Sequence, residues 1–461
     1  MRASAGLLLW SCVTAGCLPD FGAIQVVNDA GSNADAARPD AGPDAGPDAT
    51  SDAGLDAGPD AGSFVPTAID VPCETTWTEL AGGEPNCEGR LVVTVGAPFY
   101  ARAVAIGRAS DGALTVAFND FDGPDIARLV LVGFDEEAPG SAATLTTIEP
   151  EAAVGDVVGF DLAITTERPD THHLAYWLRS DFGNEIRYRT LRGAALGVVQ
   201  PLATGVGGAG AVDVALDDAN RAIVAWHDDI SGATAARREQ PDGSWSGRVT
   251  IRTDGDPRLE GYGAISLASG VSGEVHAAFQ WCITLAASSP SYSVGTLAEW
   301  SAARTLDNAA VANRASGVGV DLARAGDLIV VAYLDWTDGL GEVRLARFTS
   351  ASLEPTVERY LPDIPIVERP GAHPLVIEAD SQGWLHLLVA TASTRPLETI
   401  LEYHRQTRIG GELRWIVDTI ARLPDVEPEW VAVDMKLGPD RRPHIVYVDP
   451  ALGVRYATAR P

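Results

Sequence analysis

One pattern of hydrophobic and polar residues recurs along most of the chain. Each copy has a stretch of alternating residues, a turn with Asp or Gly, and then an apolar stretch that ends near an aromatic residue. The clearest copy covers residues 431–457. Alternation with a period of two is typical of strands, and Asp and Gly favour tight turns. The pattern therefore predicts successive antiparallel strands, and no stretch shows a convincing helical period.

The aromatic position recurs at a nearly constant spacing. Its seven occupants, in chain order, are Phe118, Tyr176, Trp226, Phe279, Tyr333, Val389 and Tyr447. Successive occupants are separated by 58, 50, 53, 54, 56 and 58 residues. A period near 50 residues with four short strands in each repeat is typical of β-propellers. The sequence therefore predicts an all-β fold, a seven-bladed β-propeller of four-stranded antiparallel blades, over residues 63–461.

Each repeat contains four predicted strands, A to D. In the third repeat they cover residues 211–216, 222–226, 233–238 and 248–251. The seventh repeat ends after strand C, which would leave an unpaired edge on the last blade. Residues 90–95 resemble strand D of the third repeat and precede the first strand A. We therefore expect residues 90–95 to form the outer strand of the last blade and to close the ring.

The first residues have the layout of a secretory signal. Arg2 is followed by an apolar run over residues 3–10 and then by small residues. Residues 13–17 (Val-Thr-Ala-Gly-Cys) resemble a bacterial lipobox, with Thr14 where Leu is usual. The resemblance implies that residues 1–17 are a lipoprotein signal peptide and that Cys17 carries the lipid. Because Leu18 is not the Asp that retains lipoproteins in the inner membrane, we expect an exported protein anchored in the outer membrane of the bacterial cell envelope.

Residues 18–62 are rich in Asp, Ala, Gly and Pro, with Asp at every fourth position from Asp40 to Asp60. Such a segment has little to bury and repels itself, so we expect a disordered, extended tether. At about 3.1 Å per residue for polyproline II, it would reach roughly 100 Å. The tether would hold the propeller well away from the membrane.

The formal net charge of the chain is -29. The tether accounts for -8 and Arg2 for +1, which leaves -22 for residues 63–461. A domain this acidic repels the phosphate backbone, so nucleic acid is excluded as a partner. Lys436 is the one lysine, which we attribute to codon usage.

Three cysteines lie beyond the signal and fit an oxidising compartment. Cys73 and Cys87 flank a short segment with Gly and Pro, and we expect them to form a disulfide worth about 3 kcal/mol. Cys282 lies in an apolar setting, and we expect a buried free thiol there.

Short motifs resemble those of the sialidases and Asp-box repeat proteins, in which a box between strands C and D ends in Trp. Residues 241–245 lie at that corner and end in Trp245, and Trp300 and Trp415 occupy equivalent places. The complete box, Ser-x-Asp-x-Gly-x-Thr-Trp, is absent, so the boxes are degenerate. The resemblance implies a shared propeller architecture. The arginine triad and the tyrosine nucleophile of sialidases have no assignable counterpart.

Four histidines share one register, three residues before the aromatic position: His173, His276, His386 and His444. Imidazoles that meet could bind a metal. In a propeller, however, equivalent positions on successive blades spread around the ring. We therefore expect these histidines to make a repeated structural hydrogen bond between blades.

Aspartates recur in strand A, the innermost strand, at Asp161, Asp213, Asp321 and Asp434. They could ring the central channel and attract a cation, or they could accept hydrogen bonds from the backbone of the neighbouring blade. Acidic turns at residues 120–125 and 335–339 are a second, weaker candidate for calcium, because Asp and Gly are ordinary turn residues. Apart from calcium, no cofactor is expected.

Two functions remain open. The first is a cell-envelope-anchored, non-enzymatic binding module for a glycan, a peptide or an envelope protein. The outward-presenting tether and the lack of a nucleophile motif favour it. The alternative is a divergent sialidase-like glycoside hydrolase or lyase, whose catalytic residues the sequence does not identify. We expect a monomer held to the membrane by its N-terminal lipid.

Overall fold

The computed structural model describes residues 67–71, 90–96 and most of 103–459, where the longest gaps are 136–143, 254–263 and 365–373. The chain divides into two compact units, residues 1–62 and 63–461, and all described strands belong to the second. Cys17, Cys73 and Cys87 lie outside the described residues, and the side chain of Cys282 is not described either. Within the described part, no helix is long and apolar enough to cross a membrane.

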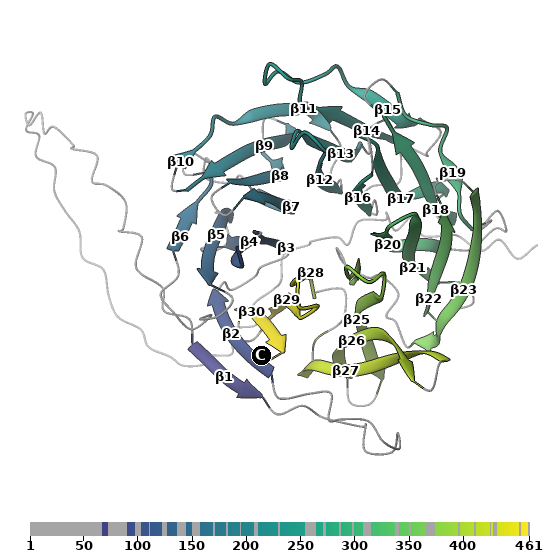
Figure 1. Cartoon of the computed structure of the whole chain (residues 1–461). Coiled ribbons are helices and arrows are strands. Elements are labelled where there is room, and N and C mark those ends of the chain that lie inside the picture. The colour runs from purple at the N-terminus through teal and green to yellow at the C-terminus, as the bar shows by residue number, and fades with distance from the viewer. Residues whose placement is uncertain are drawn as a thin grey trace, which may run out of the picture. The chain divides into compact units, whose positions relative to one another are not determined.

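The described strands form a seven-bladed β-propeller of four-stranded antiparallel blades, which confirms the predicted fold (Figure 1). The strands of the first three blades follow one another from the innermost outward. Blade 1 contains β3 (Val104–Arg108), β4 (Ala113–Phe121), β5 (Ala127–Asp135) and β6 (Thr144–Thr147). Blade 2 contains β7 (Val157–Arg168), β8 (Thr171–Arg179), β9 (Asn184–Arg192), and β10 (Ala195–Leu196) with β11 (Gln200–Val206) at the edge. Blade 3 contains β12 (Val212–Leu216), β13 (Ala222–Asp228), β14 (Ala233–Arg238) and β15 (Val249–Arg252).

Blades 4 to 6 repeat the same order. Blade 4 contains β16 (Ile265–Ser269), β17 (Val275–Thr284), β18 (Ala287–Gly295) and β19 (Arg304–Thr305). Blade 5 contains β20 (Ala315–Ala325), β21 (Leu328–Trp336), β22 (Gly341–Thr349) and β23 (Ser352–Ile364). Blade 6 contains β24 (Leu375–Ala379), β25 (Leu385–Thr394), β26 (Leu397–Ile409) and β27 (Glu412–Pro424).

The seventh blade joins the two ends of the domain. It contains β28 (Val433–Leu437), β29 (Pro443–Asp449), β30 (Gly453–Ala459) and β2 (Arg90–Gly96), which pairs antiparallel with β30. The segment expected to close the ring, residues 90–95, therefore lies in β2. A fifth strand, β1 (Thr67–Val71), pairs with the outer edge of β2 and was not expected from the sequence. Because β1 covers that edge, β2 is the fourth strand of the blade but not its outermost one.

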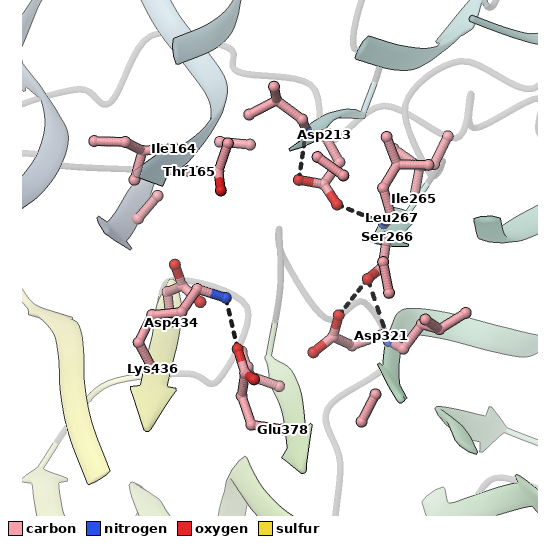
Figure 2. A pocket seen from close by; sticks show the side chains of 18 of the residues that line it. Ile164, Thr165, Asp213, Ile265, Ser266, Leu267, Asp321, Glu378, Asp434 and Lys436 are labelled. Carbon is pink, nitrogen blue, oxygen red and sulfur yellow. Dashed lines mark hydrogen bonds and ion pairs between the residues drawn. The ribbon is translucent and has the colours of Figure 1, made fainter. Parts of the chain in front are cut away.

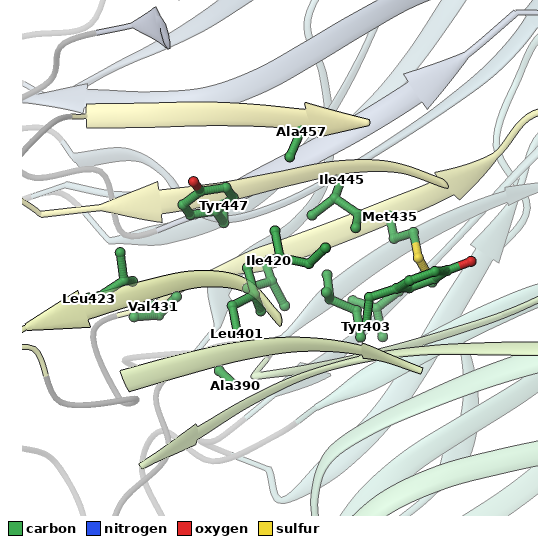
Figure 3. Close-up of a cluster of buried hydrophobic side chains, with 13 residues drawn as sticks. Ala390, Leu401, Tyr403, Ile420, Leu423, Val431, Met435, Ile445, Tyr447 and Ala457 are labelled. Atoms are coloured by element: carbon green, nitrogen blue, oxygen red, sulfur yellow. The ribbon is translucent and has the colours of Figure 1, made fainter. Parts of the chain in front are cut away.

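The core lies between the blades. Each blade packs one face on the blade before it and the other on the blade after it, so its central strands are buried on both sides. All seven residues of β29 are buried, for example. Figure 3 shows one interface, where Leu401 and Tyr403 of blade 6 meet Met435, Ile445 and Ala457 of blade 7. The aromatic position is buried in every blade because it belongs to such an interface.

The turn between strands A and B explains the recurring Asp and Gly. A left-handed residue sits at one point of the turn in six blades: Gly112, Asn220, Gly273, Gly326, Gly383 and Arg441. Asp217 and Asp380 each accept two backbone N–H bonds within their own turn. The turn residues therefore fix the register in which each strand A meets its strand B.

Candidate functional site

The innermost strands of all seven blades line a central cavity of about 540 Å³ (Figure 2). Two positions of strand A contribute residues to this channel. The upper position pairs with the residue just before the aromatic position, and the lower position lies two residues later. The upper position is occupied in chain order by Ala105, Ala163, Asp213, Ser266, Asp321, Val376 and Asp434.

The lower position carries mostly small residues. Its occupants in chain order are Gly107, Thr165, Ala215, Ala268, Ala323, Glu378 and Lys436. Blades 1, 2 and 4 thus carry small residues at both positions, whereas the charged groups come from blades 3 and 5 to 7. The channel has one small, weakly polar wall and one charged wall.

Three of the predicted strand A aspartates lie in the charged wall and bridge adjacent blades. Asp213 accepts the N–H of Leu267 in blade 4 at 2.6 Å. Asp321 accepts the N–H of Ile377 in blade 6 at 2.6 Å, and its other oxygen accepts the Ser266 hydroxyl. Asp434 accepts the N–H of Ile106 in blade 1 at 2.8 Å. These carboxylates therefore both line the channel and bond to the backbone of the next blade.

Asp161 does not belong to this set. It lies in β7, but the register of β7 and β8 shifts between Val158 and Leu162. Ala163, which pairs with Ala175, occupies the upper position in blade 2. Asp161 stands 15 residues before Tyr176, whereas Asp213 and Asp434 stand 13 residues before their aromatic residues. The side chain of Asp161 is outside the described residues.

The channel also contains an ion pair that the sequence analysis missed. Lys436 Nζ donates to Glu378 Oε1 at 2.6 Å, across the interface of blades 7 and 6. Lys436 had been assigned to codon usage, and Glu378 had not been singled out. What the two residues share is their place in the repeat, since Glu378 and Lys436 each lie at the lower position of a strand A. That position could be aligned only once the strand pairing was known.

Burial shifts the pKa values of the charged groups in this wall. Burial raises the pKa of Asp213 to about 7 and that of Asp321 to about 6, against the opposing effect of their hydrogen-bond donors. Burial also raises the pKa of Asp434. Burial alone would lower the pKa of Lys436, but the carboxylates of Glu378 and Asp434 outweigh it and raise that pKa. At neutral pH the lysine is therefore charged.

The four register histidines are bonded within blades, which corrects the expectation of bonds between blades. His173 Nδ1 lies 2.6 Å from the hydroxyl of Tyr188, His276 Nδ1 lies 2.6 Å from that of Tyr292, His386 Nδ1 lies 2.5 Å from that of Tyr403, and His444 Nδ1 lies 2.7 Å from that of Tyr456.

In each pair the histidine lies on strand B and the tyrosine on strand C. The tyrosine is not directly opposite the histidine but two residues earlier along strand C. This diagonal is a regular contact between antiparallel neighbours, and it holds the two rings in one sheet. The imidazoles are therefore separated by blade interfaces and do not converge.

The described residues bring no candidate metal ligands together. The described residues include no group of three or more His, Cys, Asp or Glu that could hold a metal ion. Of the acidic turns, residues 122–125 and 337–339 lie outside the described residues. Asp335 is buried and pairs with Arg344 at 2.5 Å.

A second constellation missed from the sequence links blades 1 to 2 and 4 to 5. The hydroxyl of Tyr176 donates to Glu149 of the preceding blade, and Arg187, directly opposite Tyr176, pairs with Glu149 at 3.4 Å. Tyr333, Asp307 and Arg344 repeat this arrangement, with the Tyr333 hydroxyl 3.1 Å from Asp307.

A Glu-x-Arg pattern at residues 185–187 and 342–344 marks both copies in the sequence. Tyr176 and Tyr333 are fully buried, and so neither can reach a substrate from the solvent. These tyrosines join blades and do not supply a nucleophile.

No family model matches the sequence, and no curated protein sequence is similar to it. Solved structures with a similar fold include the GH93 α-L-arabinofuranosidase of Fusarium graminearum in complex with arabinobiose, at 12% identity and a TM-score of 0.47 over 80% of this chain and 96% of that one. A mutant of NanB sialidase from Streptococcus pneumoniae matches at 10% identity and 0.41, over 79% and 70%. A mutant of Aleuria aurantia lectin in complex with α-methyl-L-fucoside matches at 13% and 0.42, over 72% and 97%. The propeller assignment rests on the strand pairing itself.

Proposed function

We propose that this protein is a non-enzymatic binding module of the cell envelope, and that its central channel holds a small polar ligand or the tip of a larger one. One observation carries the proposal: blades 3, 5, 6 and 7 direct Asp213, Asp321, Glu378, Asp434 and Lys436 into a single cavity. A volume of about 540 Å³ is within the usual range for small-molecule sites. A few convergent polar groups in such a cavity are typical of specific binding.

The charge of the channel favours a ligand with an ammonium group. Four carboxyl groups face the cavity against two cations, Lys436 and Arg324. Burial of the carboxyls is costly, as the raised pKa values of Asp213 and Asp321 indicate. A ligand ammonium would relieve that cost. A peptide amine or an amino sugar supplies such a group, which fits the expected glycan or peptide ligand.

The remaining parts of the proposal concern attachment. Residues 1–17 act as the lipoprotein signal, Cys17 carries the lipid, and residues 18–62 tether a monomeric propeller to the outer membrane. The support is the lipobox-like sequence and the low hydrophobicity of the tether. Metabolic labelling with a palmitate analogue tests the anchor: the wild-type chain should be labelled and Cys17→Ala should not.

Equilibrium binding tests the module. The full chain is titrated with lysine-containing peptides and with muropeptides, each compared with its N-acetylated form. The proposal expects saturable binding of the free amine, binding at least tenfold weaker after acetylation, and an unchanged ligand recovered afterwards. Equal affinity for both forms would contradict the proposed role of the channel carboxyls.

The alternative, a sialidase-like glycoside hydrolase or lyase, has one observation in its favour. Asp213 and Asp321 are two carboxyl groups in one cavity with unequal, raised pKa values, as an acid and base pair requires. Their oxygens are engaged by the next blade, however, which suits a structural role. Recovery of cleaved glycan from the titration, lost in Asp213→Asn, would favour the alternative.

A further inference from the structure

A second cavity, of about 280 Å³, lies between blades 3 and 4, away from the channel. The ends of β14 and β18 and the corners that follow them form its walls. Ala236, Gln240 and Ser246 face it from blade 3, and Glu299 and Trp300 face it from blade 4. None of these residues lines the channel.

At two other interfaces the corner tryptophan packs on a tyrosine of the preceding blade, which lies in β9 in one case and in β23 in the other. The corner Trp245 of blade 3 packs edge to face on Tyr188 of blade 2, with ring centroids 4.8 Å apart. The corner Trp415 of blade 6 lies 4.3 Å from Tyr360 of blade 5. Trp300 is the corner tryptophan of blade 4 and faces blade 3.

At the place in blade 3 that corresponds to Tyr188, the chain carries Ala236. Each lies opposite the residue that precedes the aromatic position, Ala175 for Tyr188 and Ala225 for Ala236. The small side chain of Ala236 leaves beside Trp300 the space that a tyrosine ring fills between blades 2 and 3.

The orientation of Trp300 is fixed by its own blade. Trp300 forms a β-bridge with Gly295, and a Cβ on Gly295 would lie only 2.7 Å from the indole ring. The ring therefore rests flat against the glycine backbone. Trp300 also lines the cavity and packs beside the core cluster that blades 3 and 4 share.

The rim around the indole is polar and carries more arginine than acid. Arg237, Arg238 and Arg248 line the cavity beside Glu299, and Arg248 pairs with Asp228 at 3.0 Å. Glu299 is exposed, and Gln240 and Ser246 are partly exposed. The nearby Arg238 guanidinium is already held by Asp217 at 3.1 Å and by the carbonyl of Gly273 at 2.8 Å. A ligand here needs a flat, weakly polarised face for the ring and hydroxyl groups for the rim.

We propose that this cavity binds one sugar ring, which stacks on Trp300 in the place of the missing tyrosine. The C–H groups of a sugar face suit the negative face of the indole, and the sugar hydroxyls can reach Gln240, Ser246 and Glu299. This site is separate from the channel and does not depend on the proposed function of the channel.

Saturation-transfer NMR on the full chain tests the site with four probes, the methyl glycosides of glucose, galactose, N-acetylglucosamine and fucose. At least one glycoside should receive saturation through the protons of one ring face. Trp300→Leu should weaken its binding at least tenfold. Ala236→Tyr should do the same by filling the cavity as Tyr188 does in blade 2, and because it restores a native-like ring pair, this variant should keep its melting temperature.

Trp415→Leu removes the corner tryptophan of blade 6, where Tyr360 already packs on the ring. It serves as the matched control and should bind the glycoside as the wild type does. Three results would each overturn the proposal: no transfer to any of the four glycosides, unchanged binding in a correctly folded Ala236→Tyr protein, or an equal loss of binding in Trp415→Leu.

Discussion

Burial in this propeller raises the pKa of carboxyl groups and lowers the pKa of imidazoles, so the two kinds of group change the stability of the protein in opposite directions as the pH falls. Burial lowers the pKa of His276 and His386 to about 4, so the folded protein keeps them neutral. The unfolded chain, with a histidine pKa near 6.5, binds more protons between these two values, and stability is lost as the pH falls through that window. Asp213 has a raised pKa, so its contribution is present at low pH and is lost as the pH rises through about 7.

One prediction isolates the histidine effect. His276→Gln should reduce the loss of melting temperature between pH 7 and pH 4.5, because it removes a group that contributes ~2 kcal/mol to that loss. At pH 7 the variant is less stable than the wild type, since it loses the bond to Tyr292. Calorimetric scans across the range supply the slope, and a slope equal to that of the wild type would refute the assignment.

A second residue-scale prediction concerns the bridging aspartates. Asp434→Ala leaves the N–H groups of Ile106 and Met435 without an acceptor and should cost about 2 kcal/mol. Glu378→Gln is the matched control, because it alters the same channel and leaves every inter-blade backbone bond in place. Denaturant unfolding should separate the two variants. Similar losses in both would mean that charge, and not bridging, stabilises this wall.

At the scale of strands and turns, features set by neighbouring residues along the chain could be predicted from the sequence. Alternation and Asp or Gly turns located the strands of the third blade, and the recurring aromatic position located the apolar strand B of every blade. Partners across strands were harder to predict. The pairing of β7 and β8 puts Ala163, and not Asp161, at the upper position of blade 2, and the sequence of β1 gave no sign of a strand. The diagonal His–Tyr contact likewise depends on register, which spacing along one strand does not contain.

The turn between strands A and B provides a paired test. Arg441 has a φ of 66°, a left-handed conformation that costs a non-glycine residue roughly 1 kcal/mol, and Gly383 occupies the same point of the turn in blade 6. Arg441→Gly should stabilise the protein by somewhat less than this, because it also loses a contact with Gln382. Gly383→Ala should destabilise it by about 1 kcal/mol. Thermal shifts of the same sign in both variants would contradict the argument.

The ring closure can be tested at its central strand. Residues 90–94 of β2 pair with β1 on one side and with β30 on the other, so their backbone N–H groups point alternately to these two strands. Val92→Pro removes one of these donors and should cost about 3 kcal/mol. Hydrogen exchange should show the loss first in β30, the strand that β2 covers. Unchanged protection of β30 would mean that the ring stays closed without β2.

At the scale of the whole molecule, seven blades place one residue each at two levels of a common channel. The repeat period was enough to predict the blade count, because each blade occupies a similar length of chain. The composition of the channel was only half predictable. Asp213, Asp321 and Asp434 stood out as repeated aspartates, whereas Glu378 and Lys436 are single departures from small residues at the lower position. Departures of this kind mark the one charged wall of the channel.

The most direct test of the central claim is a calorimetric titration of an amine ligand into three forms of the protein. Asp321→Asn removes a negative charge from the channel and Lys436→Gln removes a positive one. With an ammonium bound in the channel, the first should weaken binding and the second should strengthen it, each by about 1 kcal/mol or roughly fivefold. Opposite shifts would support a channel site for a cationic ligand. Affinities equal to that of the wild type in both variants would show that the ligand binds elsewhere.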